Sequence, residues 1–425
     1  MFPSYSPTNE ISSSRLSWLT NIAVFLLGAI ALVVPSGYSI GAVILLTAGL
    51  GLLVSARVPA LLKQDALVIS VLIAYATVAI AEVWWDGQGS RGLDRPIRFI
   101  LAIPALLWIL WLPPRLAFVW SGFATGAIAA GSWAFWQKFV EGAWRAGGFT
   151  HVIQFGNLSM LLGILCLAGL GWAMVQRHRS VWLSFLLFGA LAGILGSLLS
   201  GSRGGWVGFP VVLWVLYRSY GRNIAAWIKI LVAFVIVIGI FTVYALPQVG
   251  VQYRVHQAIN EVSGYLSDQD SSTSVGARFE MWRGAANLIQ EKPLFGWGEN
   301  GYQKRMAELA QENVINSNVL EYRHAHNEFI DTFAKRGVVG LVALLLLYLV
   351  PMRLFGEYLG HANLEVRSIA LAGVLLPIAY IDFGLTQAFL AHNSGVMMYA
   401  FLLAVVWGIH SVHRRQEEQL GHNRP

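Results

Sequence analysis

Tyr253 to Gly337 form a long polar stretch set between apolar runs, and the rest of the chain is organised around it. Three motifs follow one another there: Ser271-Ser-Thr-Ser-Val-Gly-Ala-Arg278-Phe-Glu-Met-Trp282, Pro293-Leu-Phe-Gly-Trp-Gly298 and Arg323-His-Ala-His326-Asn-Glu-Phe-Ile330. A chain that keeps one charged, histidine-bearing loop among apolar segments is expected to carry out its chemistry in that loop.

The apolar remainder is typical of a membrane protein. Of the 425 residues, 56% are hydrophobic and 12% are charged, whereas soluble domains carry about 25% charged residues. The single cysteine, Cys166, excludes an internal disulfide and a cysteine metal site. The first apolar run, 19–34, lacks a small-residue cleavage site, so we expect a retained span rather than a signal peptide.

The apolar runs predict an all-α polytopic membrane protein with about twelve transmembrane helices. The expected spans are 19–36, 38–56, 65–85, 97–112, 117–140, 153–175, 181–201, 206–221, 225–247, 337–355, 369–390 and 391–412. The expected domains are therefore helices 1–9 in 1–247, a catalytic loop on the outer side at 248–336, helices 10–12 in 337–412 and a cytoplasmic tail at 413–425. The two predicted spans 181–201 and 206–221, which are separated only by residues 202–205, are also compatible with one re-entrant or broken element.

The distribution of basic residues predicts the orientation. With the N-terminus inside, the inner segments hold fourteen Lys and Arg residues and the short outer loops hold six. This bias predicts that both termini are cytoplasmic and that the polar loop lies outside.

Arginine is nevertheless frequent on the predicted outer side, where the orientation rule does not explain it. The residues are Arg91, Arg95, Arg98, Arg145, Arg203, Arg254, Arg278, Arg283 and Arg323. An arginine fork binds phosphate well, so the set favours an anionic substrate at the outer surface. The alternative for any single arginine is ordinary solvation or a lipid headgroup.

The loop is too long to be structureless, and its sequence predicts short helices. Ser274 is expected to cap a helix over 276–290 whose Phe279, Trp282 and Ala286 share helical spacing. Residues 293–298 predict a turn and 306–312 another helical piece, and Asn327 is expected to start the helix that enters the next span.

His326 is the strongest candidate for a catalytic base. Neutral histidine accepts a proton from a hydroxyl at physiological pH, although a lone histidine more often caps a helix or packs. His324 would share a face with His326 if the segment is extended, so either histidine could be the base.

Arg278 and Arg203 are candidates for anion binding. Arg278 falls in the first turn of its predicted helix, where a positive side chain opposes the helix dipole unless an anion binds there. Arg203 lies between two closely spaced spans and beside glycines that allow close backbone approach. Surface placement without function is the alternative for both.

Two acidic features complete the candidates. Asp382 is the only carboxylate well inside a predicted span and could orient His326 or pair with Arg203, or form a structural ion pair. Asp268-Gln-Asp270 has the D-x-D pattern that can hold a divalent metal, but the serines that follow favour a solvated loop. No metal site or cofactor is therefore expected. The dispersed basic residues also argue against nucleic-acid binding.

Together, Ser202-Arg203-Gly-Gly, Arg278-x-x-x-Trp282, the 293–298 motif and His324-Ala-His326-Asn327 resemble the O-antigen ligase and polymerase superfamily of bacterial envelopes. The resemblance implies a metal-independent, inverting glycosyltransferase at the periplasmic face of the inner membrane. Its donor would be a glycan on undecaprenyl pyrophosphate and its acceptor a hydroxyl of lipid A–core oligosaccharide. His326 would be the base and Arg203 and Arg278 would hold pyrophosphate, with His324, Asn327, Asp382 and Trp282 as supporting residues.

Three alternatives remain open. A polymerase of the same superfamily would join one lipid-linked repeat to another, and its loop motifs hardly differ. A transporter of lipid-linked sugars would line a membrane-crossing cavity with basic residues and often shows internal repeats, which are not evident. A protein O-glycosyltransferase would need a protein acceptor site, of which the sequence gives no sign.

Overall fold

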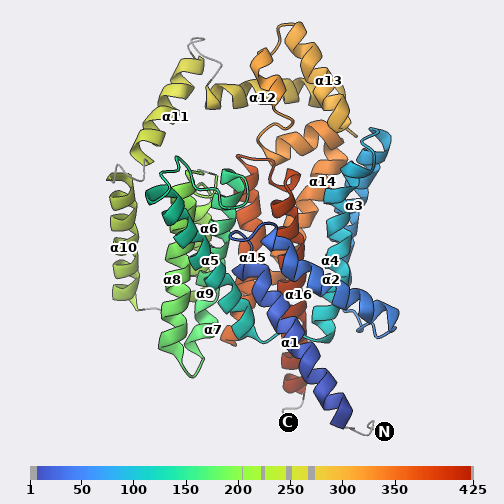
Figure 1. Ribbon diagram of the computed structural model, residues 1–425, viewed down its shortest axis with the longest axis vertical. Coiled ribbons are helices and arrows are strands. Elements are labelled where there is room, and N and C mark those ends of the chain that lie inside the picture. Colours follow the sequence, from blue (N-terminus) through green and yellow to red (C-terminus); the bar gives the residue numbers. More distant parts are fainter. Residues whose placement is uncertain (1–6, 203, 222–224, 246–250, 267–272, 423–425) are drawn as a thin grey trace.

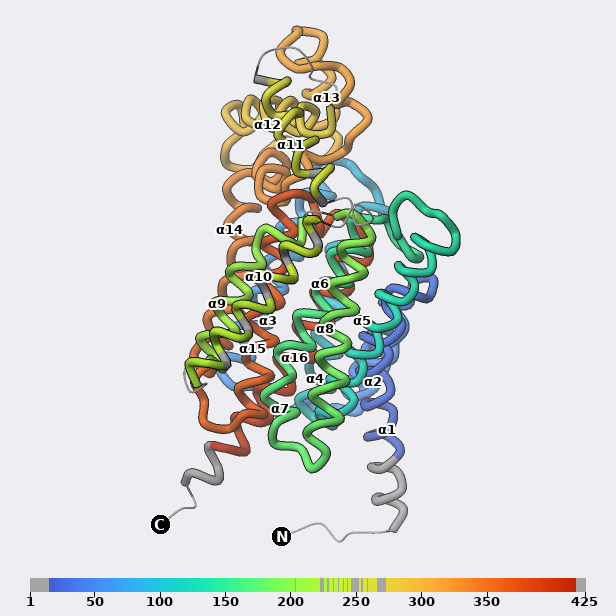
Figure 2. The backbone as a smooth tube through the Cα atoms, turned by 90° about the vertical axis from the view of Figure 1, so that its left-hand side faces the viewer, coloured from blue at the N-terminus to red at the C-terminus, as the bar shows by residue number. Residues whose placement is uncertain are grey.

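The protein is a bundle of long helices crowned at one end by a smaller helical domain, as a computed structural model describes it for residues 7–202, 204–221, 225–245, 251–266 and 273–422 (Figure 1). Within these residues there is no β-strand. The predicted all-helical class is confirmed. The start of α1 and the end of α16 lie at the end of the bundle opposite α12 and α13 (Figures 1 and 2).

The helices follow the apolar runs closely. They are α1 (Pro7–Ala29), α2 (Gly37–Val54), α3 (Lys63–Trp85), α4 (Asp94–Trp111), α5 (Leu116–Phe139), α6 (Val152–Ala168), α7 (Leu170–Met174), α8 (Arg179–Ser200), α9 (Phe209–Tyr220), α10 (Ala226–Ala245), α11 (Val251–Leu266), α12 (Ser274–Glu291), α13 (Gly298–Gln311), α14 (Glu328–Gly356), α15 (Leu364–Gly384) and α16 (Asn393–His422). Three short 3-10 turns, η1 (Ser90–Leu93), η3 (Ser317–Glu321) and η4 (Phe389–Ala391), join some of them.

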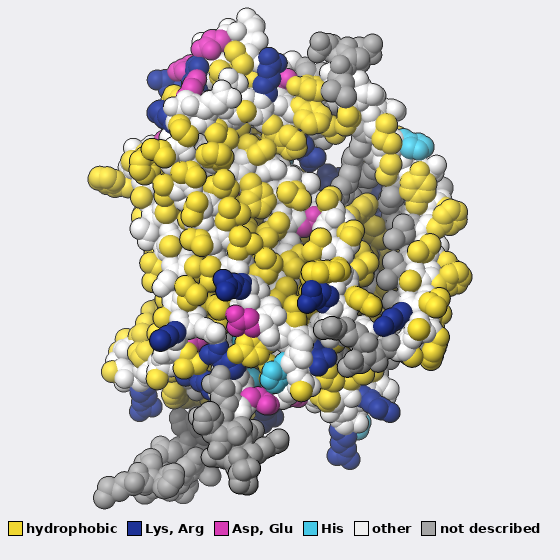
Figure 3. All heavy atoms as spheres, turned by 180° about the vertical axis from the view of Figure 1, so that it is seen from behind, with side chains coloured by type: hydrophobic (Ala, Val, Ile, Leu, Met, Phe, Trp, Pro, Cys, Tyr) yellow, Lys and Arg dark blue, Asp and Glu magenta, His cyan; other side chains and the backbone are white. Residues whose placement is uncertain are grey.

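Eight candidate membrane spans in the described residues are long and apolar enough to cross a bilayer. They correspond to α2, α3, α5, α6 with α7, α8, α14, α15 and α16, and shorter apolar stretches lie at Arg15–Ala29 and Lys229–Gly239. The chain is therefore a multi-pass membrane protein, while the count of twelve spans stays a prediction. Figure 3 shows the matching surface, a broad belt of hydrophobic side chains with most charges near its two ends.

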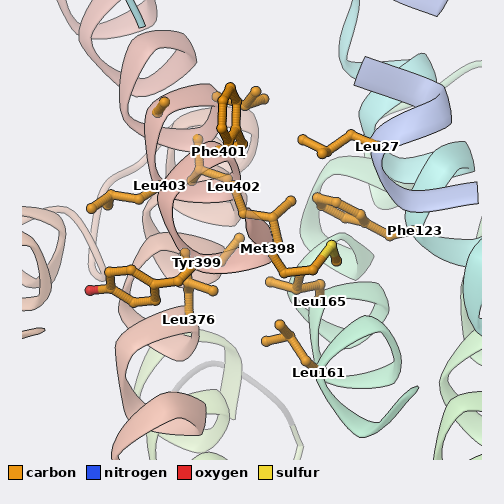
Figure 4. Packing of buried hydrophobic residues seen from close by; sticks show 14 of the residues in the cluster. Leu27, Phe123, Leu161, Leu165, Leu376, Met398, Tyr399, Phe401, Leu402 and Leu403 are labelled. Carbon is orange, nitrogen blue, oxygen red and sulfur yellow. The ribbon is translucent and has the colours of Figure 1, made fainter. Parts of the chain in front are cut away.

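Small residues let the helices of the bundle approach closely. The Ser159 hydroxyl of α6 donates a 2.9 Å hydrogen bond to the Gly193 carbonyl of α8. A Cβ at Gly193 would lie 2.6 Å from the Ser159 carbonyl oxygen, so this contact requires glycine. Large side chains fill the space between other helices, and Met398 of α16 packs beside Leu165 of α6 (Figure 4).

The polar stretch has a hydrophobic core of its own. Residues of α12, α13, η3 and the start of α14 bury one cluster: Ala277, Met281, Ala285, Leu288, Tyr302, Met306, Leu309, Ile315, Val319, Ala325 and Ala334. We call residues 273–336 the end domain. Because α14 contributes Ala334 to this cluster and Ala343 to the main core, one helix connects the two.

The structure corrects several local predictions. Thr273, and not Ser274, caps α12, since its hydroxyl accepts a 3.1 Å hydrogen bond from the Gly276 amide. Ala286 is exposed, and the buried side of α12 follows Ala277, Met281 and Leu288 instead. Two helical segments were expected in the loop, but α11 precedes them as a third. The turn at 293–298 and the helix start at Asn327 are confirmed.

Some predicted span boundaries also shift. Residues 385–390 were expected to finish a span but lie in a turn and η4 after α15. The span predicted from 337 belongs to a helix that begins nine residues earlier, at Glu328. The region 202–205 falls between α8 and α9, and its interpretation as two spans or as one broken element stays a prediction.

Candidate active site

The two histidines of the 323–327 segment lie in a short loop between η3 and α14, which we call the histidine loop. His326 has a left-handed backbone, with φ of 49°, a conformation that costs a non-glycine residue on the order of 1 kcal/mol. The segment is thus not extended there, as the prediction of a shared face had assumed. The His324 and His326 rings are nonetheless neighbours, with centroids 4.3 Å apart.

The unusual backbone is held by hydrogen bonds from three directions. Lys335 Nζ donates to the Arg323 carbonyl at 2.8 Å. The Ala325 amide donates to Asp331 Oδ1 at 2.9 Å, and Trp282 Nε1 donates to the Ala325 carbonyl at 2.8 Å. Strained backbone persists only where the surroundings over-determine it, and these contacts supply that constraint.

Lys335 anchors the loop through a buried ion cluster. Its ammonium lies 2.8 Å from Glu299 and 3.0 Å from Asp331, and its side chain is only 4% exposed. Burial alone would raise the pKa of Glu299, but the neighbouring charge of Lys335 lowers it below its ordinary value. The sequence analysis missed this cluster; the spacing of Asp331 and Lys335, four apart on one helix, was the available signal.

The 293–298 motif fits against a kink in α14. Gly337 has φ of 62° within the helix, and the Val338 amide donates to the Pro293 carbonyl at 2.8 Å. The Trp297 amide donates to the Ala334 carbonyl at 3.0 Å. A Cβ at Gly337 would overlap the Leu294 carbonyl group, so glycine is required for this close approach.

Helix α3 attaches the end domain to the bundle. Asp86, at its C-terminus, accepts hydrogen bonds from the amides of Asn300 at 2.8 Å and Gly301 at 3.2 Å. A carboxylate at the N-terminus of α13 also complements the helix dipole. Glu82 of α3 forms an ion pair with Arg336 of α14. The loop between α3 and α4 is thereby fixed next to the histidine loop.

A cavity of about 220 Å³ opens beside His326, and we call it the catalytic cavity. His326, Arg278, Tyr322 and Arg145 line it, together with Ser202 and Gly204. The structure therefore brings His326 and Arg278 to one cavity. Arg203 lies outside the described residues, but both of its neighbours at 202 and 204 face this space.

The electrostatics of the catalytic cavity keep His326 neutral. Burial, the His324 ring and the positive charge of Arg278 lower the pKa of His326 to about 3. Its Nδ1 is buried without a hydrogen bond to any described residue. A neutral imidazole can accept a proton, although a pKa this low makes it a weak base until a negative charge enters the cavity.

Buried side chains hold the turn around position 203. The Gly208 amide donates to Asp382 Oδ1 at 2.7 Å, and the Ser202 hydroxyl donates to Asn157 Oδ1 at 2.9 Å. Asp382 thus holds Gly208 at the start of α9, and among the described residues it forms no ion pair and no hydrogen bond with His326. Its pairing with Arg203 stays a prediction.

Four histidines form a row across the base of the end domain. His151 lies 6.3 Å from His392, and His392 lies 6.0 Å from His324, which adjoins His326. Burial and the neighbouring His151 and Arg95 lower the pKa of His392 to about 4. In the described part of the chain, no three His, Cys, Asp or Glu side chains are grouped so as to hold a metal ion.

The remaining candidates have mostly structural positions. Asn327 caps α14, since its Oδ1 accepts from the Phe329 and Ile330 amides, and its Nδ2 donates to the Leu385 carbonyl at 3.1 Å. Trp297 Nε1 donates to the Leu288 carbonyl at 3.1 Å. Asp268 and Asp270 lie outside the described residues.

The fold and the site define a multi-pass, all-helical membrane protein with a histidine–arginine cavity beneath an end domain. Residues 188–345 match the family model for O-Antigen ligase. This segment contains all four motifs on which the resemblance rested, so the similarity to the O-antigen ligase family over residues 188–345 is confirmed.

Two curated proteins are similar to the chain, and one of them is an O-antigen ligase. The chain is 29% identical to an uncharacterized protein of Haemophilus influenzae over 391 residues, covering 92% of this chain and 98% of that protein. It is 26% identical to the O-antigen ligase of Escherichia coli over 197 residues, which covers 45% of this chain and 44% of the ligase.

Proposed function

We propose that this protein transfers a glycan from undecaprenyl pyrophosphate to a hydroxyl of lipid A–core oligosaccharide at the periplasmic face of the inner membrane. The observation that carries the proposal is the catalytic cavity, where His326 and Arg278 lie with Ser202 and Gly204, the chain neighbours of Arg203. A base and fixed positive charge at one cavity are the two requirements for displacing a pyrophosphate leaving group.

The reaction we propose is a single displacement. His326 takes the proton of the acceptor hydroxyl as its oxygen forms a bond to the anomeric carbon of the donor sugar. The bond from that carbon to the pyrophosphate oxygen breaks, and its electron pair stays on the pyrophosphate. Arg278 and Arg203 stabilise the charge that develops there. Attack from the face opposite the leaving group inverts the anomeric configuration.

The charges that line the catalytic cavity favour a reaction in which the donor binds before His326 acts as the base. In the empty cavity, the positive charge of Arg278 is among the causes that keep the pKa of His326 near 3. Pyrophosphate bound at Arg278 would offset that charge and raise the pKa of His326. We therefore expect the base to become effective only when the donor is bound.

The supporting residues position the segments that carry the base and the arginines. Trp282 lies one turn from Arg278 on α12 and bonds the histidine loop at the Ala325 carbonyl. Asp382 holds Gly208, five residues after Arg203 in the chain. Asn327 caps the helix that follows His326.

The test is glycan transfer by purified protein in lipid nanodiscs, with lipid-linked glycan, lipid A–core and EDTA. Wild type should modify lipid A–core, and His326→Ala should lose transfer at least 100-fold. His178→Ala, which removes an exposed histidine before α8, is the matched control and should retain activity.

The same assay separates the alternatives. Lengthening of the glycan on its carrier lipid, with no product on lipid A–core, would identify a polymerase of the same family. Transfer that occurs when EDTA is left out but not when it is present would contradict a metal-independent reaction. Full activity of His326→Ala would remove His326 as the base.

A further inference from the structure

A second cavity lies on the other side of the histidine loop. Its volume is about 650 Å³, within the roughly 300–1,000 Å³ typical of ligand pockets. It lies between the α3–α4 loop, the start of α13 and the histidine loop, and Arg91, Arg95, Arg323 and His324 line it. We call it the arginine cavity.

The positive charge in the arginine cavity is only partly balanced. Lys335 and Glu299 face it but pair with each other at 2.8 Å. Arg95 Nη1 donates to the Ala391 carbonyl at 2.7 Å, which aligns its side chain without neutralising it.

Arg91 and Arg323 have no such partners. Across the described residues, neither guanidinium makes a hydrogen bond or an ion pair. Apart from Glu299, which pairs with Lys335, one carboxylate, Glu321, faces the cavity beside three arginines. This balance favours an anion, for which arginine offers a planar fork of donors.

The two cavities meet at the histidine loop. Tyr322 lines both of them, and its ring lies 5.4 Å from the His326 ring. His324 faces the arginine cavity while its ring lies 4.3 Å from that of His326. Tyr322 and His324 therefore lie between the arginine cavity and His326, each with its ring next to that of His326.

We propose that the arginine cavity binds the acceptor, through phosphate or carboxylate groups held by Arg91 and Arg323. This rests on the proposed function, which places the donor pyrophosphate with Arg278 in the catalytic cavity. Each substrate then has its own anion site, and the acceptor hydroxyl approaches His326 past Tyr322. The substrate class that follows is an acidic glycan, not a neutral one.

The experiment measures KM for each substrate with wild type, Arg91→Ala/Arg323→Ala and Arg98→Ala. Arg98 is the matched control, because it pairs with Asp94 at 2.7 Å and lines neither cavity. The double variant should raise the acceptor KM at least tenfold and change the donor KM less than twofold, while Arg98→Ala changes neither. Equal changes in both KM values, or no change in the acceptor KM, would overturn the proposal.

Modified acceptors identify the anionic group. If phosphate is bound, phosphatase-treated lipid A–core should show the raised KM with wild type and no further loss with the double variant. If carboxylate is bound, methyl-esterified acceptor should instead show the raised KM with wild type and no further loss with the double variant. An acceptor lacking both groups that retains the wild-type KM would overturn the proposal.

A binding measurement separates this inference from the proposed function. Labelled acidic oligosaccharide released from lipid A–core is titrated into wild type and the double variant without donor. Tenfold weaker binding to the double variant supports the acceptor site even if no transfer is detected, in which case only the proposed reaction fails. Normal transfer with equal binding by both proteins overturns the acceptor site alone.

Discussion

Trp282 donates a 2.8 Å hydrogen bond from its indole nitrogen to the carbonyl of Ala325, the residue directly before His326. Trp282 is one turn beyond Arg278 on α12, so this bond fixes the arginine-bearing helix to the histidine loop. The spacing Arg-x-x-x-Trp therefore places the candidate anion-binding residue, Arg278, at a fixed position relative to the candidate base, His326.

Trp282→Phe should lower kcat about tenfold and leave the donor KM nearly unchanged. The phenyl ring keeps most of the packing but loses the hydrogen bond, which is worth about 1 kcal/mol, so His326 is less well positioned. Initial rates of transfer at saturating donor measure the effect. Trp297→Phe is the control, since it also loses one indole hydrogen bond, to Leu288, but not one to the histidine loop. Equal losses of kcat in both variants would refute the positioning role.

Lys335→Met should destabilise the protein by about 3–5 kcal/mol, because it leaves the buried carboxylates of Glu299 and Asp331 without a cation. Chemical unfolding in detergent, followed by tryptophan fluorescence, measures the loss. Adding Glu299→Gln and Asp331→Asn to Lys335→Met should restore part of the stability, since the unpaired charges are then gone.

The control for the ion cluster is Arg305→Ala, in the same end domain. Arg305 contacts Glu291, Glu308 and Glu312 near the surface, and exposed pairs contribute little. Its unfolding midpoint should stay close to that of wild type. A loss as large as that of Lys335→Met would show that burial does not set the strength of these pairs.

Gly337→Ala should destabilise the end domain by about 2–4 kcal/mol. Its Cβ would overlap the Leu294 carbonyl group, and its φ of 62° already disfavours alanine. Gly142→Ala separates the two effects, because Gly142 has φ of 71° with open space around it and should lose only about 1 kcal/mol. Thermal unfolding of both variants tests this, and equal losses would mean that the close contact is unimportant.

The buried histidines predict that stability falls in acid. The pKa values of His324 and His392 are lowered, chiefly by burial, to about 3 and about 4, against 6.5 in an unfolded chain. Below pH 6.5 the unfolded chain therefore binds protons that the folded protein does not. The contribution of these neutral histidines to the free energy of unfolding is complete above pH 6.5. It falls as the pH drops toward 4, by at most about 1.4 kcal/mol per pH unit for each histidine.

The check is the unfolding midpoint between pH 8 and pH 4. His324→Gln and His392→Gln should each make the decline less steep than in wild type. His178→Gln, which replaces an exposed histidine before α8, serves as the control. A wild-type midpoint that does not change between pH 6.5 and pH 4.5 would contradict the lowered pKa values.

Much of this architecture could be predicted from local sequence. Every predicted span overlaps a helix, because a backbone in a bilayer must satisfy its own hydrogen bonds. Asn327 starts α14 as expected, since helix capping depends on a side chain and amides two or three residues away. The cap of α12 was misplaced by one residue, because Thr273 and Ser274 have equivalent hydroxyls.

The sequence by itself therefore determined the helical membrane class, the polar loop and the identity of its candidate base and arginines. Only the tertiary structure decided which of these groups meet. It places His326 with Arg278 but turns His324 to a separate cavity, and it fixes the histidine loop through Lys335 and Trp282. The physical reason is that helix formation and capping are local, whereas a cavity and a buried ion cluster depend on packing between residues far apart in the chain.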